Sequence, residues 1–235
     1  MGSRHRMVAP IILALLGVSF TGGSAAASDQ TTPPNSKAFG RSLTEWTTLY
    51  FERAFTGASD TVKRVQLLPL PVGEWQGDGD FTSAHPSTFV GTTDLTLKPG
   101  TPFVLPVAAW YGESYNTGQQ DDAPLDRSIF TDSAVHVTID GVAIIDSNVD
   151  DLERWYFGPA YFEPPILYPE PTSYGSVSAN FVQGLSLVHR PLSAGDHVLT
   201  LESEVIAFVP DYYGPGADLD IGVKYVNSWT IHISN

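Results

Sequence analysis

The stretch that decides the fold reads Val135-His136-Val137-Thr138-Ile139-Asp140-Gly141-Val142-Ala143-Ile144-Ile145. Its first five residues alternate between apolar and polar side chains, which is the period of a strand with one buried face. The Asp-Gly pair supplies the residues that a tight hairpin turn favours, because both tolerate positive φ. We therefore predict a β-hairpin with strands over 135–139 and 142–145.

Much of the remaining chain has the same character. Short runs of strand-forming residues occupy 62–68, 93–97 and 103–110, and the turn signal Lys98-Pro99-Gly100 separates the last two. Many short strands with turn residues between them are typical of an all-β domain. The sequence predicts a β-sandwich or jelly roll.

The second half of the chain suggests two further strand pairs. A second hairpin is predicted to join Val182–His189 with His197–Ile206 through Pro191-Leu192-Ser193-Ala194-Gly195, and Leu219–Val226 is predicted to pair with Trp229–Ile233. Segments 112–128 and 158–175 are predicted to be long irregular loops, and loops of that length in a compact domain are often functional.

One amphipathic helix is predicted at the N-terminal side of this domain. Ser42 and Glu45 fit a capping box, and Gly57 supplies a C-terminal stop. Apolar and aromatic side chains recur at helical spacing between them, at Leu43, Trp46, Leu49, Tyr50 and Phe55. We expect a helix over residues 43–56 whose aromatic face packs on a sheet.

The N-terminus has the pattern of a secretory signal peptide. Arg4 and Arg6 precede an apolar run over 7–18, and Ala25-Ala26-Ala27 forms a cleavage site. The alternative of a membrane anchor needs roughly 20 apolar residues, more than this run offers. We expect cleavage after residue 27, a mobile lead over 28–39, a single domain over 40–235, a secreted or periplasmic protein, and no membrane association after cleavage.

Charge limits the partners of the mature chain. The sequence has 12 basic and 26 acidic residues, so removing Arg4 and Arg6 leaves 10 against 26, a net charge of −16. Nucleic acid and anionic lipid are therefore excluded as expected partners, because their binding needs clustered Lys and Arg. The chain has no cysteine, so no disulfide restrains it.

Several short motifs resemble a group of uncharacterised secreted bacterial proteins. They are Gly40-Arg41-Ser42-Leu43-Thr44-Glu45-Trp46, the stretch from Lys98 to Val107, Val137-Thr138-Ile139-Asp140-Gly141, and Pro191-Leu192-Ser193-Ala194-Gly195-Asp196-His197. That group shares a Trp-containing N-terminal helix and a Pro-Leu-x-x-Gly-x-His hairpin near its end. The resemblance implies export and a β-sandwich-like fold, and it carries no activity.

Missing motifs exclude most named enzyme classes. The sequence has no Gly-x-Ser-x-Gly elbow, no His-Glu-x-x-His, no phosphate-binding glycine loop and no cysteine nucleophile. A nicotinamide or flavin enzyme is also excluded, because the βαβ rhythm and its glycine fingerprint are missing. No organic cofactor is expected.

Two sets of residues are candidate metal ligands. Asp78 and Asp80 flank a glycine in a turn, and paired carboxylates suit calcium, although such a pair is also an ordinary solvated turn. His189 and His197 are expected near the loop of the second hairpin, where they and Asp196 would hold a transition metal. The alternative is that a ring hydrogen-bonds the loop backbone. His136 and His232 are expected to face solvent.

Aromatic residues near the proline-rich segment are the candidate ligand-binding residues. They are Trp155, Tyr156, Tyr161, Tyr168, Tyr212 and Tyr213. Rings with polar edges stack on sugars or pack at interfaces, and prolines limit the entropy lost on binding. The sequence favours a non-catalytic binding protein for a glycan or another envelope component, or for a protein ligand.

The alternative is a carbohydrate-active hydrolase or lyase. Its acid and base groups would come from Asp78, Asp80, Glu113, Asp121 or Asp122. Two carboxylates about 5 to 9.5 Å apart in one aromatic cleft would favour that enzyme.

Overall fold

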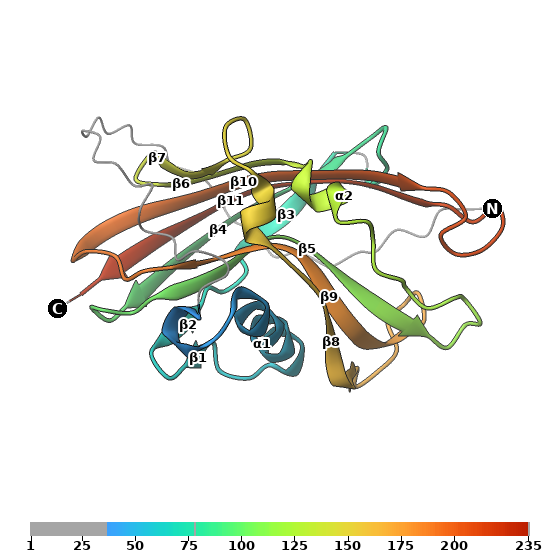
Figure 1. The fold of residues 1–235 in the computed structure, drawn as a ribbon, viewed down its shortest axis with the longest axis horizontal. Coiled ribbons are helices and arrows are strands. Elements are labelled where there is room, and N and C mark those ends of the chain that lie inside the picture. The colour runs from blue at the N-terminus through green and yellow to red at the C-terminus, as the bar shows by residue number, and fades with distance from the viewer. Residues whose placement is uncertain (1–36, 78, 235) are drawn as a thin grey trace.

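The computed structural model describes residues 37–77 and 79–234 and contains two mixed β-sheets (Figure 1). Sheet A has the order β1-β2-β5-β9-β8, with bounds β1 Thr61–Val62, β2 Val65–Leu67, β5 Phe103–Tyr115, β9 Ser176–His189 and β8 Tyr156–Leu167. Sheet B has the order β3-β4-β11-β10-β6-β7, with bounds β3 Val72–Gln76, β4 Ser87–Leu97, β11 Leu219–Ile233, β10 Gly195–Val209, β6 Ala134–Ile139 and β7 Val142–Asp146. The predicted all-β sandwich is confirmed. The predicted signal peptide, residues 1–27, and residues 28–36 lie outside the described residues.

The main core lies between the two sheets (Figure 1). Strand β10 shows this arrangement: Leu199, Leu201 and Val205 are buried against sheet A. Ser203 lies on the same face and donates to the Val107 carbonyl, whereas Thr200, Glu202 and Glu204 alternate with these residues on the opposite face. Trp229 on β11 and Phe103 on β5 are also fully buried in this layer. Alternation on the central strands of sheet B therefore buries one face and leaves the other to solvent.

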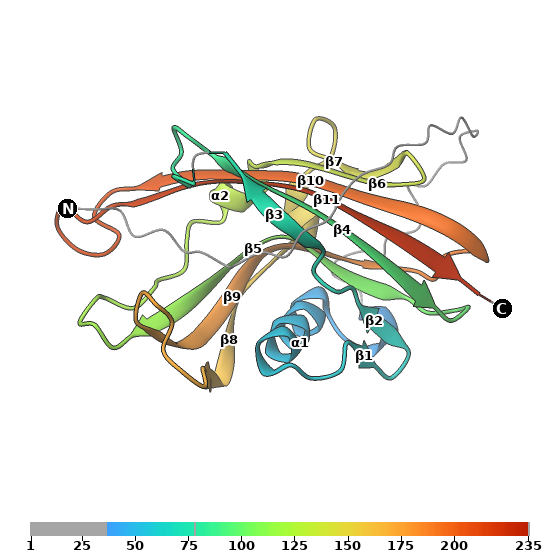
Figure 2. The same ribbon diagram turned by 180° about the vertical axis from the view of Figure 1, so that it is seen from behind.

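Helix α1 (Leu43–Thr56) covers the second face of sheet A, so the molecule has three layers (Figure 2). Both hydrogen bonds of the predicted capping box between Ser42 and Glu45 are present, and Gly57 ends the helix at a φ of 65°. Trp46 is buried and donates its indole N–H to the Ala38 carbonyl at 2.7 Å. The predicted helix is confirmed, and Ala38, expected in the lead, is buried in the short helix η1 (Ala38–Gly40).

The first predicted hairpin is confirmed. Strands β6 and β7 are antiparallel, with Val137 opposite Ile145. Asp140 and Gly141 between them have φ values of 53° and 76°, as the turn requires.

The second predicted hairpin is wrong. Strand β9 pairs with β5 and β8 in sheet A, whereas β10 pairs with β11 and β6 in sheet B. The loop from Pro191 to Ala194 therefore crosses from one layer to the other. Residues 185–189 are all buried because helix α1 and sheet B cover both faces of sheet A, and a strand buried on both faces loses its alternation.

The predicted pair between Leu219–Val226 and Trp229–Ile233 is also wrong. Both stretches belong to β11, which pairs with β10 along its whole length, including Asn227 opposite Leu201. The Asn227-Ser228 pair is a polar step inside a continuous strand and makes no turn.

The segment predicted to be irregular over 158–175 is largely strand. Tyr156–Leu167 forms β8 at the edge of sheet A, with register shifts between Phe157 and Ala160 and between Tyr161 and Ile166. The prolines at 159, 164 and 165 fall inside those shifts, where a missing N–H costs no ladder hydrogen bond. The first residues of the other predicted loop, 112–115, likewise continue β5.

Two short helical segments complete the connections. Helix α2 (Ser128–Thr131) precedes β6, and η2 (Leu152–Trp155) leads into β8. Within the described part of the chain, no helix is both long and apolar enough to cross a membrane.

Candidate functional site

The six aromatic residues predicted to bind a ligand do not share one surface. Trp155 is only 3% exposed and belongs to the core between the sheets, so the prediction that it binds a ligand is wrong for this residue. Tyr156 lies half-buried under the Arg127 guanidinium, whose carbon is 4.8 Å from the ring centroid. Tyr161, on the edge strand β8, is 56% exposed.

The other three rings are engaged elsewhere. Tyr168 packs against the core beneath α1, with its ring 6.0 Å from that of Phe55. Tyr212 and Tyr213 lie in the turn between β10 and β11 in an edge-to-face pair, and Tyr212 also contacts the Trp110 ring. The predicted recognition loop is therefore divided among separate packing environments.

A buried carboxylate cluster forms at one end of sheet A. Glu113 on β5 is fully buried, and its Oε1 atom accepts hydrogen bonds from Tyr168 and Ser176 at 2.8 Å each and from Tyr174 at 3.4 Å. Burial raises the pKa of Tyr168, and the adjacent Glu113 carboxylate raises it further, so the phenol stays protonated and donates. These contacts join the β8–β9 connection to β5.

The neighbouring acidic residues fix the loop that follows β5. Asp122 is buried and accepts hydrogen bonds from the Glu113 backbone N–H at 3.0 Å and from the Tyr115 hydroxyl. Asp121 accepts from the Ser114 hydroxyl at 2.8 Å. The structure thus brings Glu113, Asp121 and Asp122 together, but their contacts hold loops in place and Glu113 is sealed from solvent. This arrangement gives little support to the predicted hydrolase or lyase.

The predicted calcium pair is only partly described. Asp78 lies outside the described residues, and Asp80 is exposed. Among residues 37–77 and 79–234, no group of three or more His, Cys, Asp or Glu side chains is placed to hold a metal ion. Calcium at Asp78 and Asp80 stays a prediction.

The predicted metal set of His189, His197 and Asp196 does not assemble. The His189 ring is buried and donates from Nδ1 to the Arg190 carbonyl at 2.6 Å, whereas Asp196 pairs with His232 at 2.8 Å. The His189 ring, bonded to a backbone carbonyl beside this loop, fits the alternative of a ring held by the backbone. His197 lies with Nε2 3.1 Å from the Ser193 carbonyl oxygen and 3.2 Å from the Ser193 hydroxyl oxygen. His136 is exposed, as predicted.

The outer face of sheet B carries a stripe that sequence reasoning missed. Alternate residues of β10 point away from the core there: Glu202, Glu204, Ile206 and Phe208. Ile206 and Phe208 are 48% and 57% exposed, although their positions on a solvent-facing strand favour polar residues. The sequence signal that could have predicted this surface is the pair of apolar residues, Ile206 and Phe208, at outward positions of the strand. We call these four residues the β10 stripe.

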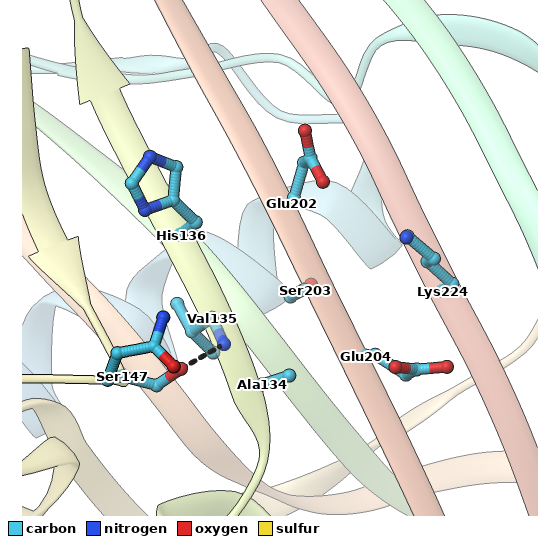
Figure 3. A pocket seen from close by; sticks show the side chains of 9 residues that line it. Ala134, Val135, His136, Ser147, Glu202, Ser203, Glu204 and Lys224 are labelled. Carbon is cyan, nitrogen blue, oxygen red and sulfur yellow. Dashed lines mark hydrogen bonds between the residues drawn. The ribbon is translucent and has the colours of Figure 1, made fainter.

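Charged and polar side chains border this stripe on both sides. Figure 3 shows Glu202 and Glu204 between His136 on β6 and Lys224 on β11, and the register places Glu202 opposite His136 and Glu204 opposite Lys224. Asp146 lies 3.9 Å from the His136 ring. Hydrogen bonds from Asn148 lower the pKa of Asp146, so this carboxylate keeps its negative charge at the rim.

Two shallow depressions follow the stripe from Glu202 to Ile206, and Phe208 lies beyond their lining. One of about 180 Å³ is lined by residues that include His136, Asn148 and Lys224, and one of about 430 Å³ is lined by residues that include Ile129 and Ile206. Both include Glu204 and Ala134 in their lining, so the depressions adjoin. They form an open groove with carboxylates towards one end and apolar groups towards the other.

Comparisons with family models, curated proteins and solved structures find no match for this chain. The resemblance to secreted bacterial proteins therefore stays a prediction.

Proposed function

We propose that this protein is an exported binding protein that holds a polysaccharide along the β10 stripe. The observation that carries the proposal is the exposed Ile206 and Phe208 pair in line with Glu202 and Glu204 on one open sheet face. Sugars present both apolar ring faces and hydroxyl groups. A strip that carries hydrogen-bonding groups at one end and apolar surface at the other matches both.

The shape of the site suits a polymer more than a small molecule. The four stripe residues span six residue steps, which at about 3.3 Å per residue gives about 20 Å of strand. Small ligands usually bind in concave pockets that bury most of their surface. An extended chain gains affinity from repeated contacts along an open groove, as several sugar units would here.

Charge narrows the class of polysaccharide. The groove contains Glu202 and Glu204 with Asp132 at its side, against Lys224 as its one Lys or Arg side chain among the described lining residues. Uronic acid polymers would be repelled by this balance. We infer that the ligand is a neutral or amino-sugar polymer of the envelope or extracellular matrix, which is where the predicted signal peptide would send the protein.

The test is retention of the purified protein on immobilised polysaccharides of neutral, amino-sugar and uronic acid types. Ile206→Ala and Glu204→Gln, both at residues that line the groove, should each weaken binding by about 1 to 3 kcal/mol, which is roughly 5- to 150-fold, with little change in the melting temperature. Val149→Ala is the matched control, because Val149 is 82% exposed and lies outside the groove. Equal retention of all variants, or retention on uronic acid polymers alone, would contradict the proposal.

A further inference from the structure

A serine, a histidine and an aspartate meet where the β6–β7 turn lies against the start of β10. His197 Nδ1 lies 2.7 Å from Asp140 Oδ2, and His197 Nε2 lies 3.2 Å from Ser193 Oγ. Asp140 is itself held, because its other oxygen accepts the Val198 backbone N–H at 2.8 Å. A hydroxyl, an imidazole and an orienting carboxylate in this order are the parts of an activated nucleophile.

The contacts determine where the protons lie on the ring. A carboxylate only accepts, so His197 Nδ1 carries a hydrogen and donates it to Asp140. In the neutral ring Nε2 is then an acceptor, and the Ser193 hydroxyl donates to it. The Ser193 carbonyl oxygen, 3.1 Å from the same Nε2, is an acceptor that bonds the ring only once Nε2 is protonated. Ser193 thus offers His197 Nε2 a hydrogen-bond partner both before and after proton transfer, first its hydroxyl and then its carbonyl oxygen.

Exposure allows a substrate to reach the hydroxyl. Ser193 is exposed, whereas the His197 side chain is only 12% exposed and so is held in position. The backbone N–H of Ala194 directly follows Ser193, which is a position that serine hydrolases use to bind an oxyanion. Because Ser193 is exposed, the site admits an ester whose alcohol component is large.

We propose that Ser193, His197 and Asp140 hydrolyse acyl esters, such as acetyl esters on sugars. Ser193 Oγ would bond to the ester carbonyl carbon while its proton passes to His197 Nε2. The bond to the alcohol oxygen then breaks, and the alcohol leaves with the proton from Nε2. Water attacks the acyl carbon and gives its proton to Nε2, which returns it to Ser193 Oγ as the acid departs. This activity does not depend on polysaccharide binding along the β10 stripe.

The first experiment uses the purified protein and a fluorophosphonate probe. Mass spectrometry of peptides should locate the label on Ser193, and Ser193→Ala should prevent labelling. The second experiment measures hydrolysis of 4-nitrophenyl acetate at pH 8. Ser193→Ala and His197→Asn should each lower the rate by about 100-fold or more, because the nucleophile and its base act as a unit.

His232→Asn is the matched control. His232 also contacts an aspartate, Asp196, at 2.8 Å. This variant should keep the parent rate within about twofold. If the parent is not labelled at Ser193 and hydrolyses the ester no faster than Ser193→Ala, the proposal is overturned. Loss of hydrolysis in His197→Asn with none in Ser193→Ala would overturn it too, because the imidazole would then act alone. Ser193 is exposed, so its alanine variant should fold even if His197→Asn does not.

Discussion

The buried histidine of β9 makes the stability of the protein depend on pH in a defined direction. His189 is fully buried and stacks on Phe103 at a centroid distance of 4.9 Å. Its Nδ1 donates to the Arg190 carbonyl, and its Nε2 has no hydrogen-bond partner among the described residues. Burial is the largest cause that lowers the pKa of His189, from an ordinary 6.5 to about 4.

The sign and the magnitude follow from linkage between proton binding and unfolding. Between pH 6.5 and pH 4 the unfolded chain binds a proton at this ring and the folded chain does not, so the free energy of unfolding falls as the pH falls. Above pH 6.5 the protein has the full unfolding free energy, because the His189 ring is then largely unprotonated in both states. A difference of 2.5 pKa units corresponds to about 3 kcal/mol in total, of which about 2 kcal/mol is lost between pH 7 and pH 5.

Urea unfolding at pH 5, 6 and 7 measures this loss, with His189→Asn as the comparison. Asparagine retains an N–H donor for the Arg190 carbonyl and does not titrate. The wild type should lose about 2 kcal/mol more than the variant between pH 7 and pH 5, because every other titrating group is common to both proteins. An equal loss of unfolding free energy between pH 7 and pH 5 in the two proteins would refute the reasoning.

Three further predictions concern packing and ions. Trp155→Ala should lower the free energy of unfolding by about 3 to 5 kcal/mol, and Tyr161→Ala should change it little, as thermal or urea unfolding would show. Tyr168→Phe should cost about 1 to 3 kcal/mol in the same assay, because a buried carboxylate loses a hydrogen bond, and an unchanged stability would mean that the Glu113 cluster contributes nothing. If Asp78 and Asp80 bind calcium, a chelator should lower the melting temperature and excess calcium should restore it.

Local chemistry predicted the elements whose partners are close in sequence. The α1 helix follows from its capping box and the β6–β7 hairpin from its Asp-Gly turn, because both signals act within a few residues. The loop from Pro191 to Ala194 shows the limit of such signals. Its residues indicate that the chain turns, but they do not indicate whether the next strand joins the same sheet or the opposite layer.

The candidate sites were harder to predict because their members are far apart along the chain. Glu113 meets Tyr168, Tyr174 and Ser176, which lie at least 55 positions later, and only the pairing of β5 with β9 brings them together. Asp140 likewise reaches His197 across 57 positions. Apolar residues at outward positions of β10 were visible in the sequence, but their meaning depended on knowing which face of the strand is buried.

The strand order of sheet B affects how the chain completes its fold during synthesis. The most C-terminal strand, β11, lies between β4 and β10, and its parallel partner β4 lies more than a hundred residues earlier. Pairings of such high contact order form late, because the loop between the partners must close first. The β3–β4 pair is therefore left without its central neighbour until residues 219–233 have been synthesised, so sheet B closes only when the chain is nearly complete.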